Sequence, residues 1–360
     1  MPPRQLPVLD GLRAIAVLMV LWCHVPKEVP GYPDWLRIAD FLVGPGGFGV
    51  ELFFVLSGFL ITRILISERQ RAVPVRWFLL RRCLRIFPIY YLLLAIMLVV
   101  RPSADIAWCA LYLSNFKSIV AHVDWPIAHT WSLCIEEHFY LLWPLAVAFL
   151  PLQRARHILV FVVFPVAIVG AFVVSEFMTG ERAFVTVMHG SPFRFLSLGA
   201  GALMAFHERG IEAARGRALL LALGLVTVAV VLHPDLVFFR PMLQEQAPWV
   251  DRRYEPLLWL IQSASLCTGL VLLTILWDLR APRNLLTVAP LRAIGRISYA
   301  VYLYHLPLFH WLLYPQPTGA NVLVAIGATF AAATLSWFAL ERPLQRVSAR
   351  FRDRPRGPGH

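Results

Sequence analysis

The sequence predicts an all-α membrane protein, a polytopic bundle of about ten transmembrane helices with one short re-entrant or interfacial helix. Of its 360 residues, 59% are apolar and 15% are charged, whereas soluble domains have about a quarter of their residues charged. The apolar residues gather in runs such as 158–174, 219–232 and 322–339. Each run approaches the roughly 20 residues that span a bilayer. Several such runs indicate a helical bundle and exclude a water-soluble domain.

The apolar runs place the predicted spans in chain order. They lie near residues 9–26, 48–66, 84–100, 131–150, 158–177, 193–207, 218–233, 257–277, 298–314 and 321–339. The run at 106–116 is too short to cross alone, so it is expected to be the re-entrant or interfacial helix. The first run follows Arg4 and Arg13 as in a signal peptide, but no small-x-small cleavage site comes after it. It is therefore expected to be the first spanning helix.

The basic residues indicate an orientation. The chain has 33 basic and 21 acidic residues, a net charge of +12, which in a soluble protein would suggest nucleic-acid binding. No basic helix with interleaved aromatic residues stands apart, so no nucleic-acid partner is expected. With a cytoplasmic N-terminus and the ten spans above, 24 of the 33 basic residues lie on the cytoplasmic side, as the positive-inside rule requires. Both termini are therefore expected to be cytoplasmic.

The remaining features suggest one domain. Residues 1–343 form the predicted membrane domain, and the arginine-rich segment 344–360 is expected to be a cytoplasmic tail resting on anionic lipid. Residues 234–256 are expected to form a long outer loop beside the acceptor entrance. The five cysteines are scattered and contain no CxxC pair, so neither a disulfide framework nor a metal site is predicted.

Ionisable residues inside apolar runs are the candidate functional groups, because they are costly at membrane depth. Arg13 and His24 are eleven residues apart, which in a helix is roughly 20° beyond three full turns and about 16 Å. They therefore share one stripe of the first helix, with Asp10 beside Arg13. A histidine can take a proton from a hydroxyl and return it to a leaving group. The alternative is an interfacial histidine without a catalytic role.

A second group of candidates is Arg81, Arg82 and Arg85 at the start of the third span. Arg82 and Arg85 project from the same helix face. Paired guanidinium groups suit phosphate recognition, although on spacing alone positive-inside anchoring explains them better.

The segment HTWSLCIEEHFYLLWP, residues 129–144, places Glu136 and Glu137 in an apolar helix. Glu136 is a candidate for orienting His24 or binding a sugar hydroxyl, and a protonated carboxyl in the core is the alternative. In RISYAVYLYHLP, residues 296–307, His305 follows Ser298, Tyr299 and Tyr302. This segment is expected to line a donor channel, unless it is a packed polar belt.

The glycines of GGFGVELFFVLSGFLIT, residues 46–62, form no phosphate loop, because no GK[ST] accompanies them. Ser57 and Gly58 are explained by close helix approach. Glu51, at the start of this span, is a further candidate.

Together these segments resemble the acyltransferase family three of integral-membrane O-acyltransferases. That family modifies bacterial surface polysaccharides, lipopolysaccharide, nodulation factors and some macrolides. The resemblance covers nearly the whole chain, in order: LDGLRAIAVLMVLWCH, GVELFFVLSGFLIT, RRCLRIFPIYY, HTWSLCIEEHFYLLWP, PFRFLSLGAGALMAF, RISYAVYLYHLP and ALERP. The family's Arg-x10-His pattern falls on Arg13 and His24, and its Arg-x-x-Arg pattern on Arg82 and Arg85. His138 departs from the family, which usually has glutamine there.

The resemblance implies an enzyme of the bacterial cytoplasmic membrane that transfers an acyl group, expected to be acetyl, to a hydroxyl of a surface or exported glycan or glycolipid. The donor would be acetyl-CoA, a substrate rather than a bound cofactor. His24 is then expected to be the general base, oriented by Glu136 and supported by Arg13. The donor is expected at Arg82, Arg85 and His305, and the acceptor at Trp131, Glu51 and Glu137. A glycolipid transporter or flippase that uses the same polar residues as a substrate path is the alternative.

Overall fold

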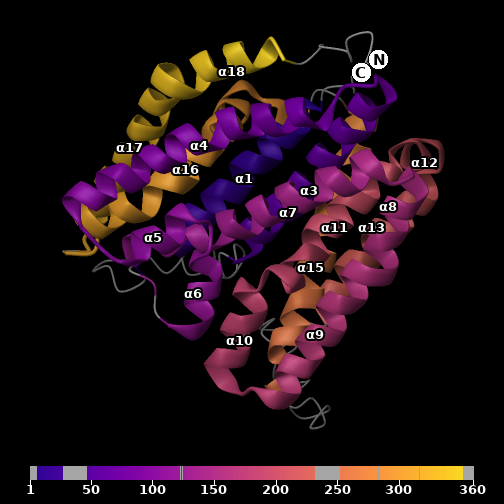
Figure 1. Ribbon diagram of the computed structural model, residues 1–360, viewed down its shortest axis with the longest axis horizontal. Coiled ribbons are helices and arrows are strands. Elements are labelled where there is room, and N and C mark those ends of the chain that lie inside the picture. Colours follow the sequence, from indigo (N-terminus) through magenta and orange to yellow (C-terminus); the bar gives the residue numbers. More distant parts are fainter. Residues whose placement is uncertain are drawn as a thin grey trace.

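The protein is described here from a computed structural model that covers residues 6–26, 47–121, 123, 125–231, 252–281, 284–315 and 317–351. Every regular element in these ranges is helical (Figure 1). The fold class is therefore confirmed as all-α. Most of the predicted outer loop 234–256, and the predicted tail from residue 352 on, lie outside the described residues.

Helices make up most of the described residues of each of the ten predicted spans. The long elements are α1 (Pro7–Cys23), α3 (Gly47–Gln70), α4 (Val75–Val100), α7 (Thr130–Phe149), α11 (Ser191–Phe206), α13 (Arg215–Val231), α15 (Glu255–Arg280), α16 (Ala289–Leu312) and α17 (Gly319–Ser336). The fifth predicted span is formed by α8 (Leu152–Ile158), a π-helical turn (Leu159–Val163) and α9 (Phe164–Phe177). The shorter helices are α5 (Asp105–Ala110), α6 (Ser114–Val120), α10 (Gly180–His189), α12 (Glu208–Ala213) and α18 (Arg342–Ala349).

The number of spans is smaller when only long, strongly apolar helices are counted. Within the described residues, five stretches qualify: Gly47–Gln70, Val75–Val100, Leu152–Phe177, Glu255–Leu279 and Gly319–Ala349. Helices α1, α11 and α13 have 17, 16 and 17 residues, fewer than the roughly 20 of a straight span. Helices α7 and α16 are longer but carry interior Glu, His, Ser and Tyr residues. The chain is thus a multi-pass membrane protein, and the count of ten is not confirmed.

Burial separates central helices from peripheral ones. Of the most apolar part of α3, 67% is buried, against 22% for both Leu152–Phe177 and Gly319–Ala349. The two peripheral stretches expose large apolar side chains, among them Phe161, Phe177 and Leu323. A helix that is apolar on its exposed side is stable only where lipid replaces water. Helix α3 therefore forms the inner framework, and α9 and α17 face the bilayer.

The crossing of α3 and α11 depends on two glycines. A Cβ atom at Gly58 would overlap the carbonyl oxygen of Leu198, and one at Gly201 would overlap that of Val55. The backbones of these helices touch because neither position has a side chain. The sequence-based explanation of Gly58 is confirmed, whereas the neighbouring Ser57 hydroxyl donates a hydrogen bond to Glu136 at 2.8 Å.

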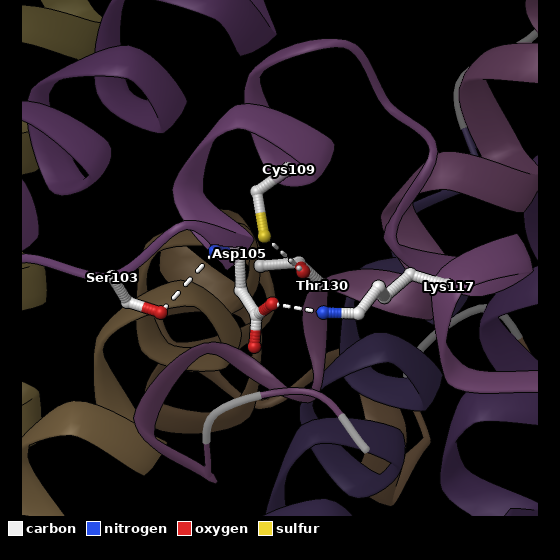
Figure 2. A network of polar contacts seen from close by, with 5 residues as sticks. All are labelled: Ser103, Asp105, Cys109, Lys117 and Thr130. Carbon is white, nitrogen blue, oxygen red and sulfur yellow. Dashed lines mark hydrogen bonds and ion pairs between the residues drawn. The ribbon is translucent and has the colours of Figure 1, made fainter. Parts of the chain in front are cut away.

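Helices α5 and α6 replace the single short helix predicted at 106–116, and polar contacts tie them to α7 (Figure 2). Asp105 of α5 forms an ion pair with Lys117 of α6, and its backbone N–H donates to Ser103 Oγ at 3.2 Å. Cys109 Sγ lies 3.3 Å from Thr130 Oγ1 at the first residue of α7. These contacts hold the beginning of α7, where His129 and Trp131 lie.

Candidate active site

One cavity gathers the arginines that the sequence singled out. It has a volume of about 270 Å³, lies between α1, α3, α4, α7 and α16, and is named here the arginine cavity. Its polar lining residues are Arg13, Ser57, Arg82, Arg85, Ser132, Glu136, Ser298, Tyr299 and Tyr302. Arg82 and Arg85 reach it together because three residues of helix place them on one face of α4.

The charged side chains that line this cavity are mostly basic. Arg13, Arg82 and Arg85 are close enough to repel one another, and the carboxylate that lines the cavity with them is Glu136. Glu136 accepts hydrogen bonds from Ser57 at 2.8 Å and Tyr140 at 3.0 Å. Buried Glu341, just before α18, attracts Arg85 and Arg13. A cavity with three guanidinium groups and one lining carboxylate is suited to an anion.

Two buried polar atoms of the arginine cavity lack a protein partner. Arg82 Nε and Ser298 Oγ have no hydrogen-bond partner within the described part of the chain. The Arg82 guanidinium carbon lies 3.9 Å from the centre of the Tyr140 ring, which holds the guanidinium in place through a cation–π contact. Unsatisfied buried donors are destabilising, and oxygen atoms of a bound anion would satisfy them.

A second cavity contains His24. It has a volume of about 600 Å³ and is named here the histidine cavity. Cys23, His24, His129, Trp131 and His189 line it, with Glu181 and Arg182 at its exposed rim. His24 directly follows the last residue of α1, and its backbone carbonyl accepts a hydrogen bond from Tyr314 at 2.9 Å.

The ring of His24 is held in one tautomer. Its Nδ1 lies 2.8 Å from the carbonyl oxygen of Val20, and a carbonyl can only accept, so Nδ1 carries the proton. The lone pair of the neutral ring is then on Nε2. This is the state that a general base requires.

Three histidines lie together at this point. The ring centre of His305 lies 5.0 Å from that of His24 and 5.1 Å from that of His129. His129 Nε2 donates to the Leu303 carbonyl at 3.1 Å, and His305 Nδ1 donates to the Tyr302 carbonyl. Their other nitrogens, His129 Nδ1 and His305 Nε2, are buried and have no hydrogen-bond partner among the described residues. Two unsatisfied acceptor nitrogens are therefore buried within this histidine cluster.

Trp131 forms an aromatic platform in the histidine cavity. Its ring stacks on His189 of α10 with centres 4.3 Å apart and an angle of 17° between the planes. Helix α10 lies between two predicted spans. Burial lowers the pKa of His189 to about 4, and the nearby charge of Arg194 acts in the same direction. The stacked imidazole is therefore neutral at neutral pH.

The two cavities share part of their walls. Among the described residues, Val50 and Tyr302 line both. The predicted cationic and imidazole groups therefore line two cavities that meet at a common wall.

The placement of Glu136 corrects one expectation. Glu136 was expected to orient His24, but it lies in the arginine cavity with Ser57 and Tyr140 as its partners. Glu136 lies seven positions after His129, a rise of roughly 10 Å along the helix. His129, at the N-terminal end of α7, therefore lies at the level of His24. The sequence motif that begins at residue 129 contained this histidine, but no periodicity assigned it a role.

His305 also differs from its expected place. It does not line the arginine cavity, where a donor was expected, but is completely buried against His24 and His129. Tyr302, one turn earlier on α16, lines the arginine cavity instead.

Glu51 and Glu137 line neither cavity. Glu51 is completely buried, forms an ion pair with Arg194 and accepts a hydrogen bond from Ser197. The Arg194 guanidinium carbon in turn lies 4.9 Å from the centre of the Trp259 ring. Glu137 interacts electrostatically with Arg82 from an adjacent face of α7. Both acids are placed as partners of arginines.

His138, which departs from the family pattern, makes a polar contact through each of its ring nitrogens. Its Nε2 lies 3.0 Å from the carbonyl of Tyr112, and its Nδ1 lies 2.7 Å from the hydroxyl of Ser191. These bonds connect α7 with the loop between α5 and α6 and with the start of α11.

Comparisons with known proteins agree with the sequence motifs. A family model described as an acyltransferase domain matches residues 6–341. O-acetyltransferase OatA of Staphylococcus aureus is 28% identical over 372 residues, which cover 96% of this chain and 58% of that protein. Peptidoglycan O-acetyltransferase OatA of Listeria monocytogenes is 26% identical over 374 residues, covering 95% and 56%. The chain thus spans a little more than half of the length of these curated relatives. No solved structure matches it.

Proposed function

Because the chain belongs to the acyltransferase family whose model matches residues 6–341, we propose that it is a membrane O-acetyltransferase. It moves an acetyl group from cytoplasmic acetyl-CoA to a hydroxyl of an exported cell-envelope glycan. The observation that carries this proposal is the shared wall: Val50 and Tyr302 line both the arginine cavity and the histidine cavity. A thioester held on one side can meet an alcohol held on the other.

The arginine cavity suits the donor. The phosphate groups of acetyl-CoA present many acceptor oxygens, which Arg13, Arg82 and Arg85 match with N–H donors. Arg82 Nε and Ser298 Oγ are the buried atoms that such oxygens, or the polar groups of the pantetheine arm, would satisfy. The cavity is otherwise lined by apolar side chains such as Phe53, Phe54 and Ile61. These side chains suit the acetyl end and the alkyl parts of the arm.

The histidine cavity suits a glycan acceptor. Its larger volume, its Trp131 platform and the charged Glu181 and Arg182 at the rim combine an aromatic face with polar groups. Such a combination suits a sugar ring, which has one apolar face and a polar edge. The Listeria relative is named for peptidoglycan, so a peptidoglycan-like glycan is the acceptor that we propose.

The chemistry assigned to His24 follows from its tautomer. Nε2 takes the proton of the acceptor hydroxyl while the hydroxyl oxygen attacks the thioester carbonyl carbon. The C–S bond then breaks, the ester is released, and the proton passes to the CoA thiolate. Arg13 and Glu136 hold the donor end, because both line the arginine cavity. In this arrangement, the arginine cavity opens toward the cytoplasm of a bacterium and the histidine cavity toward the outside.

The test uses membranes that contain the full chain, acetyl-CoA labelled in its acetyl group, and peptidoglycan fragments. Wild type is expected to form an alkali-labile O-ester, and His24→Ala to lose this activity. His157→Ala is the matched control, because His157 is exposed on α8 and lines neither cavity. Its activity is expected to equal that of wild type.

Two outcomes would contradict the proposal. If no glycan or glycolipid acquires label while the protein moves a glycolipid across vesicles, the protein is a transporter. Full transfer by His24→Ala would retain the enzyme but remove His24 as its base.

A further inference from the structure

Tyr302 lies where donor and acceptor would react. It is the polar residue, among those described, that lines both cavities; Val50 is the other residue of the shared wall. Under the proposed function, the thioester carbonyl must reach this wall from the arginine cavity to meet a hydroxyl from the histidine cavity. The side chains that contact the carbonyl oxygen during the reaction must therefore belong to this wall or lie directly beside it.

A pair of hydroxyl groups is held at this position. The hydroxyl oxygen of Tyr302 lies 2.6 Å from Ser132 Oγ. The Tyr302 hydroxyl is also 3.0 Å from the backbone carbonyl of His129, and Ser132 Oγ is 3.1 Å from the same carbonyl. Tyr302 comes from α16, and Ser132 from the first turn of α7.

This arrangement leaves one hydroxyl proton available. The two hydroxyls share one carbonyl, and either of them can satisfy it. When Ser132 donates to the carbonyl of His129, the proton of Tyr302 can turn to another acceptor and no buried group loses its only partner. A negative charge that develops during a reaction is stabilised best by a hydroxyl that can turn toward it without leaving its former acceptor unsatisfied. If a buried carbonyl lost its only hydrogen bond, that loss would offset the stabilisation of the charge.

We propose that Tyr302, released by Ser132, donates a hydrogen bond to the thioester carbonyl oxygen as that oxygen becomes negative. This inference rests on the proposed function. As the acceptor hydroxyl attacks the carbonyl carbon, the C=O π electrons move to oxygen, and Tyr302 stabilises the oxyanion without losing its proton. When the C–S bond breaks, the C=O bond re-forms and Tyr302 can return to the carbonyl of His129. Tyr302 is thus a catalytic residue, and Ser132 is a positioning residue that acts through it.

The variant Tyr302→Phe tests this role, because it keeps the ring and removes the hydroxyl. Its kcat is expected to fall by about 10²–10³-fold, as when one oxyanion donor is removed. The KM for acetyl-CoA is expected to stay within about twofold, because the interaction forms in the transition state. Tyr304→Phe is the matched control. Tyr304 is on the same helix and its hydroxyl donates to Ser336 at 3.1 Å, but it lines neither cavity.

Ser132→Ala tests the release mechanism. Without the Ser132 hydroxyl, the Tyr302 proton remains on the carbonyl of His129, so kcat is expected to fall as well. Because Ser132 acts only through Tyr302, the double variant is expected to be no slower than Tyr302→Phe, rather than to show the product of the two losses. Additive losses would show that Ser132 does not act through Tyr302.

Binding measurements separate a catalytic role from a structural one. A CoA thioether that lacks the carbonyl is expected to raise the melting temperature of purified wild type and of Tyr302→Phe equally. A Tyr302→Phe protein with unchanged kcat would overturn the inference and leave the proposed function intact. Raised KM or lost thioether binding with unchanged kcat would likewise overturn it. Wild-type protein that forms no O-ester would overturn the proposed function, and this inference with it.

Discussion

A substitution of Arg85 should affect donor binding and protein stability differently. Arg13 and Arg82 repel its charge, Glu341 attracts it, and it lines the arginine cavity. In the unliganded protein Arg85 is therefore a partly buried charge that two arginines repel and one acid, Glu341, attracts. We expect Arg85→Met to leave the melting temperature of the unliganded protein unchanged or higher, since it removes repulsion and retains an apolar stem.

The same substitution should weaken donor binding. A hydrogen bond to a charged group contributes about 1.5–3 kcal/mol, which corresponds to a rise in Kd of about 10- to 150-fold. At CoA concentrations about 100 times the wild-type Kd, ligand stabilises the wild-type protein by about 2.7 kcal/mol. If Kd rises about 100-fold, the same CoA concentration stabilises the variant by only about 0.4 kcal/mol.

The assay is the CoA-dependent melting temperature of detergent-purified protein, together with the KM for acetyl-CoA. Arg76→Met is the control, because Arg76 is exposed on the same helix and lines neither cavity. The reasoning is refuted if Arg85→Met retains the wild-type response to CoA. It is refuted equally if the unliganded variant is strongly destabilised, since Arg85 would then serve the fold.

Three further substitutions test other parts of the structure. Glu51→Gln leaves Arg194 buried without its counter-charge and should destabilise the fold by about 3–5 kcal/mol. The KM for the acceptor, measured on folded protein, should stay unchanged. A raised acceptor KM at full stability would instead support the substrate role predicted from sequence. Gly58→Ala forces a methyl group into the α3–α11 crossing and should lower stability by about 1–3 kcal/mol in thermal unfolding, so an unchanged melting temperature would contradict this helix crossing. Since the pKa of His189 is lowered from 6.5 to about 4, the unfolded chain binds more protons there between these pH values, and stability should fall as the pH drops through this window. His189→Phe keeps the stack on Trp131 and should flatten that part of the pH–stability curve, and an equally steep curve would exclude His189 as its cause.

Much of the fold could be predicted because membrane helices satisfy their hydrogen bonds locally. In lipid, every apolar run of sufficient length must be helical, and helices make up most of the described residues of the ten predicted segments. The predicted helix at 106–116 was wrong in detail, because residues 111–113 leave the helical path and divide it into α5 and α6. The left-handed backbone of Tyr112, with φ of 55°, could not be predicted, because no glycine stands at this position.

The candidate site could be predicted where residues share one helix. Arg82 and Arg85 lie together in the arginine cavity, as their spacing on α4 predicts. Spacing along one helix carries no information about which residue of another helix lies opposite. For this reason Glu136 was expected beside His24, and His129 was not recognised as its neighbour.

The sequence by itself determined that this chain is an all-helical, multi-pass membrane protein and a member of its acyltransferase family. Composition and helical periodicity are properties of single segments, so the sequence is sufficient to recognise them. Only the tertiary structure decided that His24, His129 and His305 meet, that Glu51 is paired with Arg194, and that Tyr302 is shared by two cavities. These relations depend on the depth and rotation at which helices pack, and packing is set by side chains far apart in the sequence.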